Sequence, residues 1–151
     1  MIMHVRWRRP LRLHDGSEDN LIYTLDTNRV PDEPGIYVFA RQWGDGYEAL
    51  YVGQGNSLRA RVGQQFNNLR LMRHIENART GNRIVFVGEV ITRPGQNLET
   101  CLNLVERALI RYFMSEGHDL VNRQGARIRR HEINSADRTR GFVPGLMYLE
   151  M

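Results

Sequence analysis

The sequence has almost no cysteine, no long apolar run and no secretory signal, and each absence excludes a class of protein. Cys101 is the one cysteine among 151 residues, so the chain forms no internal disulfide and no multi-cysteine zinc site. No stretch approaches the roughly 18 apolar residues that a membrane-spanning helix needs. The basic N-terminus lacks the apolar segment of a secretory signal. We therefore expect a cytoplasmic protein of one domain, without a membrane partner.

Lysine is absent altogether, so all 21 basic residues are arginines. Arginine suits phosphate groups because its planar guanidinium donates two hydrogen bonds at once, although a GC-rich gene explains missing lysine equally well. Residues 15–48 contain two arginines and eight acidic residues, whereas residues 49–140 contain 15 arginines and eight acidic residues. The formal net charge of +4 is thus compatible with an anionic partner, which would bind the second part of the chain.

The hydrophobic pattern predicts a small single-domain α/β fold. Residues 35–40 and 48–53 are rich in β-forming residues and bounded by turns, which predicts two antiparallel strands, and residues 83–91 predict another. Helices are predicted for residues 57–66, with Ser57 as the N-cap, and for residues 69–79 and 98–115. A loose alternation over residues 5–13 is typical of an edge strand. We expect a sandwich in which a short mixed or antiparallel sheet of about three central strands is flanked by helices.

Two tyrosines on the first two of these strands are followed closely by arginines. Tyr37 ends the triplet GIY, and Tyr51 begins the triplet YVG. Arg59 and Arg61 come next, at the start of the predicted helix and off its apolar stripe. Two phenols with adjoining guanidinium groups are more polar than a hairpin needs, which makes this stretch the candidate active site.

Glu106 is an anomaly on the predicted helix 98–115. Its neighbours at helical spacing are Leu102, Asn103, Leu109 and Ile110. The carboxylate therefore lies at the edge of the apolar stripe, where it needs an arginine, a tyrosine hydroxyl or a metal ion as partner. Structural carboxylates outnumber catalytic ones, so an ion pair, for example with Arg61, stands beside the metal-ligand interpretation.

Together these residues resemble the GIY-YIG nuclease superfamily. The triplets at residues 35–37 and 51–53 and the arginine at position 61 stand in the order of that family, and YVGQGNSLRARV is similar to its strand, loop and first helix. The resemblance continues at Glu106 in VERALIRYF and at Asn122 in LVNR, where the family has a metal-binding glutamate and a supporting asparagine. It covers residues 30–125, and five motif elements in order make it specific.

The resemblance implies an endonuclease that hydrolyses DNA phosphodiester bonds at a single-metal site. Glu106 would be the protein ligand of Mg²⁺ or Mn²⁺, while water and phosphate oxygens fill the other positions. Arg61 would stabilise the charge that grows on the phosphate. The tyrosines would orient the attacking water, and one would accept its proton. Which one does so stays open, because a phenol with a pKa of about 10 needs help to act as a base at neutral pH. The implied catalytic residues are Tyr37, Tyr51, Arg61, Glu106 and Asn122.

The chain departs from the family pattern at two positions. Many members have a lysine after the second triplet, where this chain has Gln54, and a histidine or tyrosine four residues past the helix arginine, where it has Gln65. Glutamine binds phosphate or water but transfers no proton. This departure favours a second hypothesis, a nucleic-acid-binding module of the same fold with weak or no catalysis.

The expected partner is the phosphate backbone of DNA, with binding that weakens steeply as salt rises. The side chains predicted to contact it are Arg59, Gln65, Arg70, Arg73, Arg123 and Arg127. We expect an N-terminal extension over residues 1–29, a nuclease-like core over residues 30–125 and a basic tail over residues 126–151 that packs on the core. A third hypothesis, an interaction domain that binds no nucleic acid, rests on the acidic residues 15–48.

Overall fold

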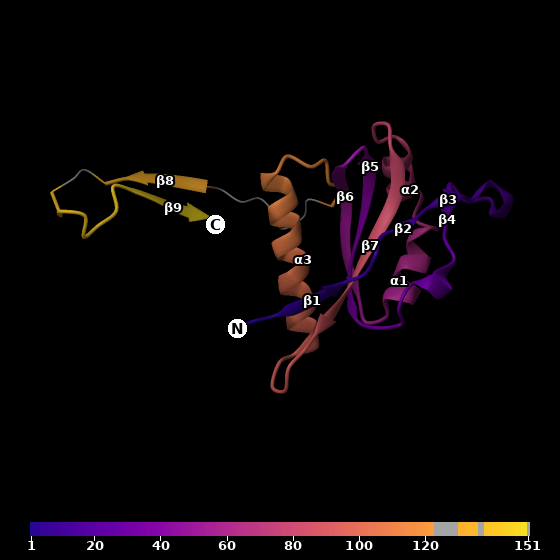
Figure 1. The fold of residues 1–151 in the computed structure, drawn as a ribbon, viewed down its shortest axis with the longest axis horizontal. Helices are drawn as coiled ribbons and strands as arrows, with labels where there is room; N and C mark the ends of the chain where they lie inside the picture. Colours follow the sequence, from indigo (N-terminus) through magenta and orange to yellow (C-terminus); the bar gives the residue numbers. More distant parts are fainter. Residues whose placement is uncertain (123–129, 136–137, 151) are drawn as a thin grey trace.

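The fold is centred on a five-stranded sheet. The computed structural model describes residues 1–122, 130–135 and 138–150. Its strands follow the order β1–β7–β5–β6, and β2 also pairs with β7 (Figure 1). Their bounds are β1 His4–Trp7, β2 Leu11–Arg12, β5 Gly35–Trp43, β6 Gly46–Gly55 and β7 Asn82–Ile91. The described pairings are all antiparallel. The expected α/β class is confirmed, and of the two expected sheet types the antiparallel one is found, although the sheet has five strands instead of about three.

Helices cover both faces of this sheet (Figure 1). On one face α1 (Leu58–Gln65) and α2 (Leu69–Glu76) enclose a core with Tyr37 and Phe39 of β5. On the other face α3 (Leu98–Ser115) packs on Ile36 and Val38 of the same strand. Alternation along β5 thus supplies two cores, one for each helical layer. Within the described ranges, no helix is both long and apolar enough to cross a membrane.

The N-terminal segment completes the sheet. The edge strand expected over residues 5–13 is confirmed, since β1 and β2 both pair with β7. A small ribbon of β3 (His14–Asp15) and β4 (Tyr23–Thr24) follows, with the short 3₁₀ helices η1 (Ser17–Asp19) and η2 (Thr27–Arg29). Within the expected N-terminal extension, residues 1–29, β1 and β2 thus add two strands to the sheet of the core.

The C-terminal hairpin, β8 (Arg130–Asn134) and β9 (Leu146–Glu150), stands apart from the sheet beyond α3 (Figure 1). That the tail, residues 126–151, packs on the core stays a prediction, and residues 126–129, 136–137 and 151 of it lie outside the described residues.

Side-chain caps define the helices at the predicted places. Ser57 accepts a hydrogen bond from the backbone N–H of Ala60 and so begins α1, and α3 has the predicted bounds. α2 ends at Glu76, three residues earlier than predicted. Arg83 explains the difference, because its Nε takes the carbonyl of Ile75 at 2.8 Å, which a longer helix would use for its next turn. The same guanidinium also binds the carbonyls of Glu76, Ala78, Arg79 and Gly81.

A bulge in β6 sets which face each of its side chains takes. Phe39 pairs with Tyr51 and Ala40 with Ala49, which leaves Leu50 as an extra residue. Leu50 and Tyr51 consequently both join the core beneath α1 and α2, while Ala49 and Val52 join the core beneath α3. The bulge therefore brings Tyr51 onto the same face as Tyr37.

Candidate active site

The two tyrosines of the motif lie against each other on the α1 face of the sheet. Their rings stack with centroids 6.0 Å apart and an angle of 27° between planes. Tyr37 is opposite Gly53 in the register, and a Cβ atom on Gly53 would collide with the Tyr37 ring. Position 53 in the second triplet therefore requires glycine, because the ring of Tyr37 from the first triplet fills the space that a side chain would occupy.

Gln65 of α1 ties the phenols together. Its Nε2 donates to the Tyr37 hydroxyl at 2.6 Å and to the Tyr51 hydroxyl at 3.5 Å, the limit of a hydrogen bond. Asn68 donates to the Gln65 Oε1 at 3.2 Å, an arrangement that directs the amide nitrogen toward the tyrosines. Only 4% of Gln65 is exposed. The contact of Gln65 with nucleic acid stays a prediction. Its side chain lies in the core, where it is the polar partner that a buried phenol needs.

Burial distinguishes the chemistry of the two phenols. Tyr37 is fully buried, and desolvation together with the neighbouring Tyr51 raises its pKa well above the ordinary value, although Gln65 and Arg61 oppose the shift. Tyr51 is partly exposed. A water molecule can therefore reach Tyr51 directly, whereas Tyr37 stays neutral beneath it.

Arg61 lies where α1 passes close to the end of β6. A Cβ atom on Gly55 would come within 2.9 Å of the Arg61 Cβ, so glycine at position 55 permits the close approach. The guanidinium is exposed and touches Gln64 at 3.3 Å. Its positive charge opposes the burial-driven rise in the pKa of both Tyr37 and Glu106. One arginine thus lies within electrostatic reach of Tyr37 and of the carboxylate.

Glu106 reaches this position from α3, on the other face of the sheet. Burial raises its pKa above the ordinary value, while a hydrogen bond from Gln54 and the charge of Arg61 oppose the shift. In residues 1–122 and the described part of the hairpin, no basic side chain lies within ion-pair distance of this carboxylate. The expected alternative of a direct ion pair with Arg61 is therefore not formed, and the carboxylate is only partly compensated.

The donor set around Glu106 suits one magnesium ion that is otherwise held by water and substrate. The described residues contain no group of three or more histidine, cysteine or acidic side chains that could hold a metal ion by themselves. Mg²⁺ is nevertheless commonly bound by one or two carboxylates, with water and phosphate oxygens in the remaining positions. Glu106 fits this requirement, because an accessible carboxylate destabilised by burial gains from a nearby cation.

Asn122 supports the site from the open edge of β6. Its side-chain amide accepts from the Val52 N–H at 3.2 Å and donates to the Val52 carbonyl, in the way that another strand would. The preceding residues continue the contact: His118 Nδ1 accepts from the Ala49 N–H at 2.8 Å, and the Val121 N–H donates to the Leu50 carbonyl at 2.9 Å. The catalytic role of Asn122 stays a prediction. Its amide is bound to the backbone beside Tyr51, so it positions the strand.

The predicted phosphate contacts have different surroundings. Arg59 is half-buried and donates to the Val30 carbonyl at 3.0 Å, which joins α1 to the loop before β5. Arg70 and Arg73 are exposed on α2, as a contact with the phosphate backbone of DNA would require. Arg123 and Arg127 lie outside the described residues.

Two amides at the site were not predicted. Asn103 accepts from Gln54 at 2.6 Å, and Asn68 fixes the orientation of Gln65. Asn103 lies three residues before Glu106 on α3, so helical spacing would have identified it as a neighbour. Asn68 is the N-cap of α2, and an asparagine before a predicted helix is the signal for that position.

Comparisons with models of known protein families, with curated proteins and with solved structures found no match for this chain.

Proposed function

We propose that the protein is a divalent-metal-dependent endonuclease that hydrolyses phosphodiester bonds of DNA. The observation that carries the proposal is that Arg61 lies within electrostatic reach both of Tyr37, whose ring stacks on Tyr51, and of the half-buried carboxylate of Glu106. Such a set of groups is suited to bind a cation, a phosphate and a water molecule.

The exposed guanidinium of Arg61 would bind a nonbridging phosphate oxygen and stabilise the negative charge that develops there. Tyr51, the accessible phenol, would orient the attacking water, with Tyr37 and Gln65 fixing its ring and hydroxyl. Glu106 would hold Mg²⁺ or Mn²⁺. When bound, such an ion polarises a phosphoryl oxygen and stabilises a leaving oxygen.

Plasmid nicking tests the proposal. Supercoiled DNA is incubated with the protein and Mg²⁺ or Mn²⁺, with and without a chelator, alongside Glu106→Gln and Arg61→Ala. Each substitution should lower the rate by about a hundredfold or more, while Arg138→Ala, in the exposed part of the C-terminal segment, serves as the control. Cleavage that survives chelation, or that Glu106→Gln leaves unchanged in a folded protein, would rule this mechanism out.

A second candidate is a nucleic-acid-binding module of the same fold with weak or no catalysis. It is favoured by the pairing of Tyr37 with Gln65, because a buried phenol with a raised pKa is a poor base and an amide transfers no proton. This candidate predicts salt-sensitive DNA binding in a mobility-shift assay, without metal-dependent turnover of the plasmid.

A further inference from the structure

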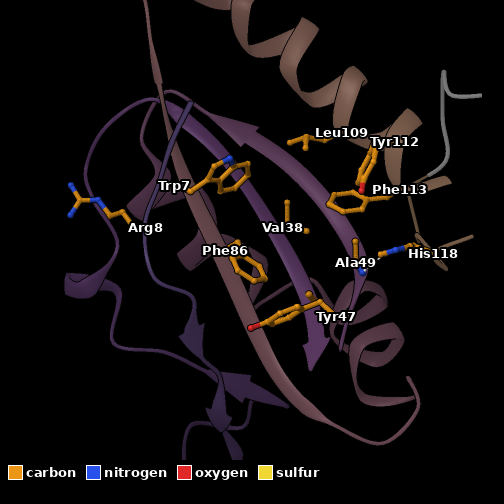
Figure 2. Close-up of a pocket in the computed structure, with 11 residues that line it drawn as sticks. Trp7, Arg8, Val38, Tyr47, Ala49, Phe86, Leu109, Tyr112, Phe113 and His118 are labelled. Carbon is orange, nitrogen blue, oxygen red and sulfur yellow. Dashed lines mark hydrogen bonds between the residues drawn. The ribbon is translucent and has the colours of Figure 1, made fainter. Parts of the chain in front are cut away.

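The sheet face beneath α3 is only partly covered. α3 packs mainly on β6, and a groove of about 420 Å³ opens between its C-terminal half and β1 (Figure 2). Val38 of β5 lies in the floor. The aromatic residues around it come from four elements: Trp7 of β1, Tyr47 of β6, Phe86 of β7, and Tyr112 and Phe113 of α3. Arg8 directs its guanidinium away from the groove, toward Glu89.

The aromatic side chains around this groove are more exposed to solvent than the packing of α3 on the sheet requires. Trp7, Tyr47 and Tyr112 are 42%, 45% and 57% exposed, and they stand around the same hollow. Single exposed apolar side chains are ordinary, but a contiguous apolar patch indicates a contact surface. A sheet face is stable when another layer covers it, so the groove lacks an apolar cover.

The C-terminal hairpin also has an exposed apolar face. The register pairs His131 with Leu149 and Ile133 with Met147, so these four side chains share one face. Ile133 and Leu149 are 42% and 49% exposed. A two-stranded hairpin is at best marginally stable in water unless its apolar face packs on something else.

We propose that the apolar face of this hairpin docks into the groove of a second copy of the chain, reciprocally, to form a twofold dimer. The hairpin stands on the far side of α3 from its own sheet, so its own helix separates it from its own groove (Figure 1). In a reciprocal exchange, the hairpin of each copy covers the aromatic groove of the other. A twofold-symmetric dimer therefore buries both grooves and both hairpin faces. The proposal is independent of catalysis.

Molar mass in solution tests the dimer. The full chain, measured by light scattering over a wide range of concentrations, should have twice the chain mass. Leu149→Asp places a charge in the contact and should raise the dimer dissociation constant by roughly tenfold or more. The matched control is Leu146→Asp, which is similarly exposed but belongs to the opposite face of the hairpin and should leave the dimer intact. A monomer at every concentration, or equal effects of the two substitutions, would overturn the proposal.

Cross-linking tests which surfaces meet. Tyr112→Cys and Leu149→Cys are prepared separately, mixed and oxidised; the native Cys101 is buried and does not compete. The mixture should give a disulfide-linked dimer in which each partner carries one substitution, and neither variant alone should give it. A double variant that closes the same disulfide within one chain, while the mixture gives none, would show that the hairpin covers its own groove and would overturn the exchange.

Discussion

The side-chain amide of Gln65 donates a 2.6 Å hydrogen bond to the hydroxyl of Tyr37, and this contact joins α1 to the central strand β5 inside the core. Both groups are nearly or fully removed from solvent, so neither can exchange its partner for water. The polar centre of the candidate site is therefore also part of the folded core.

Gln65→Met, of similar shape, removes the donor and leaves the Tyr37 hydroxyl without its amide partner. We expect the free energy of unfolding to fall by about 1–3 kcal/mol, measured by chemical denaturation. Gln64→Met is the control on the neighbouring exposed position and should change stability by less than about 0.5 kcal/mol. Equal effects at both positions would contradict the role given to this hydrogen bond.

Two glycine substitutions should act in opposite directions. Gly53→Ala forces a methyl group into the Tyr37 ring and should destabilise the protein by about 1–3 kcal/mol. Gly63→Ala, in the interior of α1, meets only Thr27 Cγ2 at 3.4 Å and should be neutral or stabilising by up to about 1 kcal/mol. Thermal unfolding of both variants measures the difference. A stabilising Gly53→Ala would show that the tyrosine does not lie over this glycine in solution.

The pH dependence of stability should carry the signature of Glu106. Burial raises its pKa above the ordinary 4.5, so the folded protein binds this proton more tightly than the unfolded chain. The contribution is fully present below the ordinary pKa and is lost as pH rises through the raised pKa. Glu106→Gln should therefore be more stable than the native chain at neutral pH and similar to it in acid. A native chain that is the more stable of the two at neutral pH without metal would contradict this sign.

Magnesium should reverse that difference. An ion that binds the folded state through Glu106 stabilises it by RT ln(1 + [Mg²⁺]/Kd). We expect added Mg²⁺ to raise the melting temperature of the native chain and to leave that of Glu106→Gln unchanged, in differential scanning fluorimetry at constant ionic strength. Equal shifts in both proteins would place the ion elsewhere.

Asn122→Ala should loosen the edge of β6. The Val52 N–H and carbonyl both lose their partner, and we expect a loss of about 1–3 kcal/mol in stability. Native-state hydrogen exchange should show faster exchange of the Val52 amide in particular. Asn67→Ala, at an exposed position, is the control. Protection of Val52 that survives the substitution would exclude the edge-pairing role.

Arg70 and Arg73 should contribute to DNA binding without reading sequence. Their joint replacement by alanine should weaken binding for all sequences alike and lower the salt slope by about one for each phosphate that the variant no longer neutralises. Fluorescence anisotropy with duplexes of different sequence measures both quantities, and Arg138→Ala serves as the control. An unchanged slope would remove α2 from the interface.

Most elements of the fold could be predicted from the chain, because local signals determine them. Ser57 begins α1 through its own side chain, and the apolar stripe of α3 extends over the predicted range. The turn between β5 and β6 uses a positive φ of 55° at Gly44, a conformation that glycine favours. The two tyrosines, Arg61 and Glu106 are predicted as site residues from their spacing and from the family resemblance that this spacing carries.

What each side chain faces depended on the tertiary structure. Gln65 is buried because α1 turns it toward a phenol 28 residues earlier in the chain. Asn122 pairs with the backbone of β6 because that strand ends the sheet, and sheet order is not visible in local sequence. The influence of Arg61 on Glu106, from opposite faces of the sheet, likewise depends on how closely α1 and α3 approach β6. Local sequence determined the elements and the reactive residue types, whereas long-range packing decided which of those residues share a site.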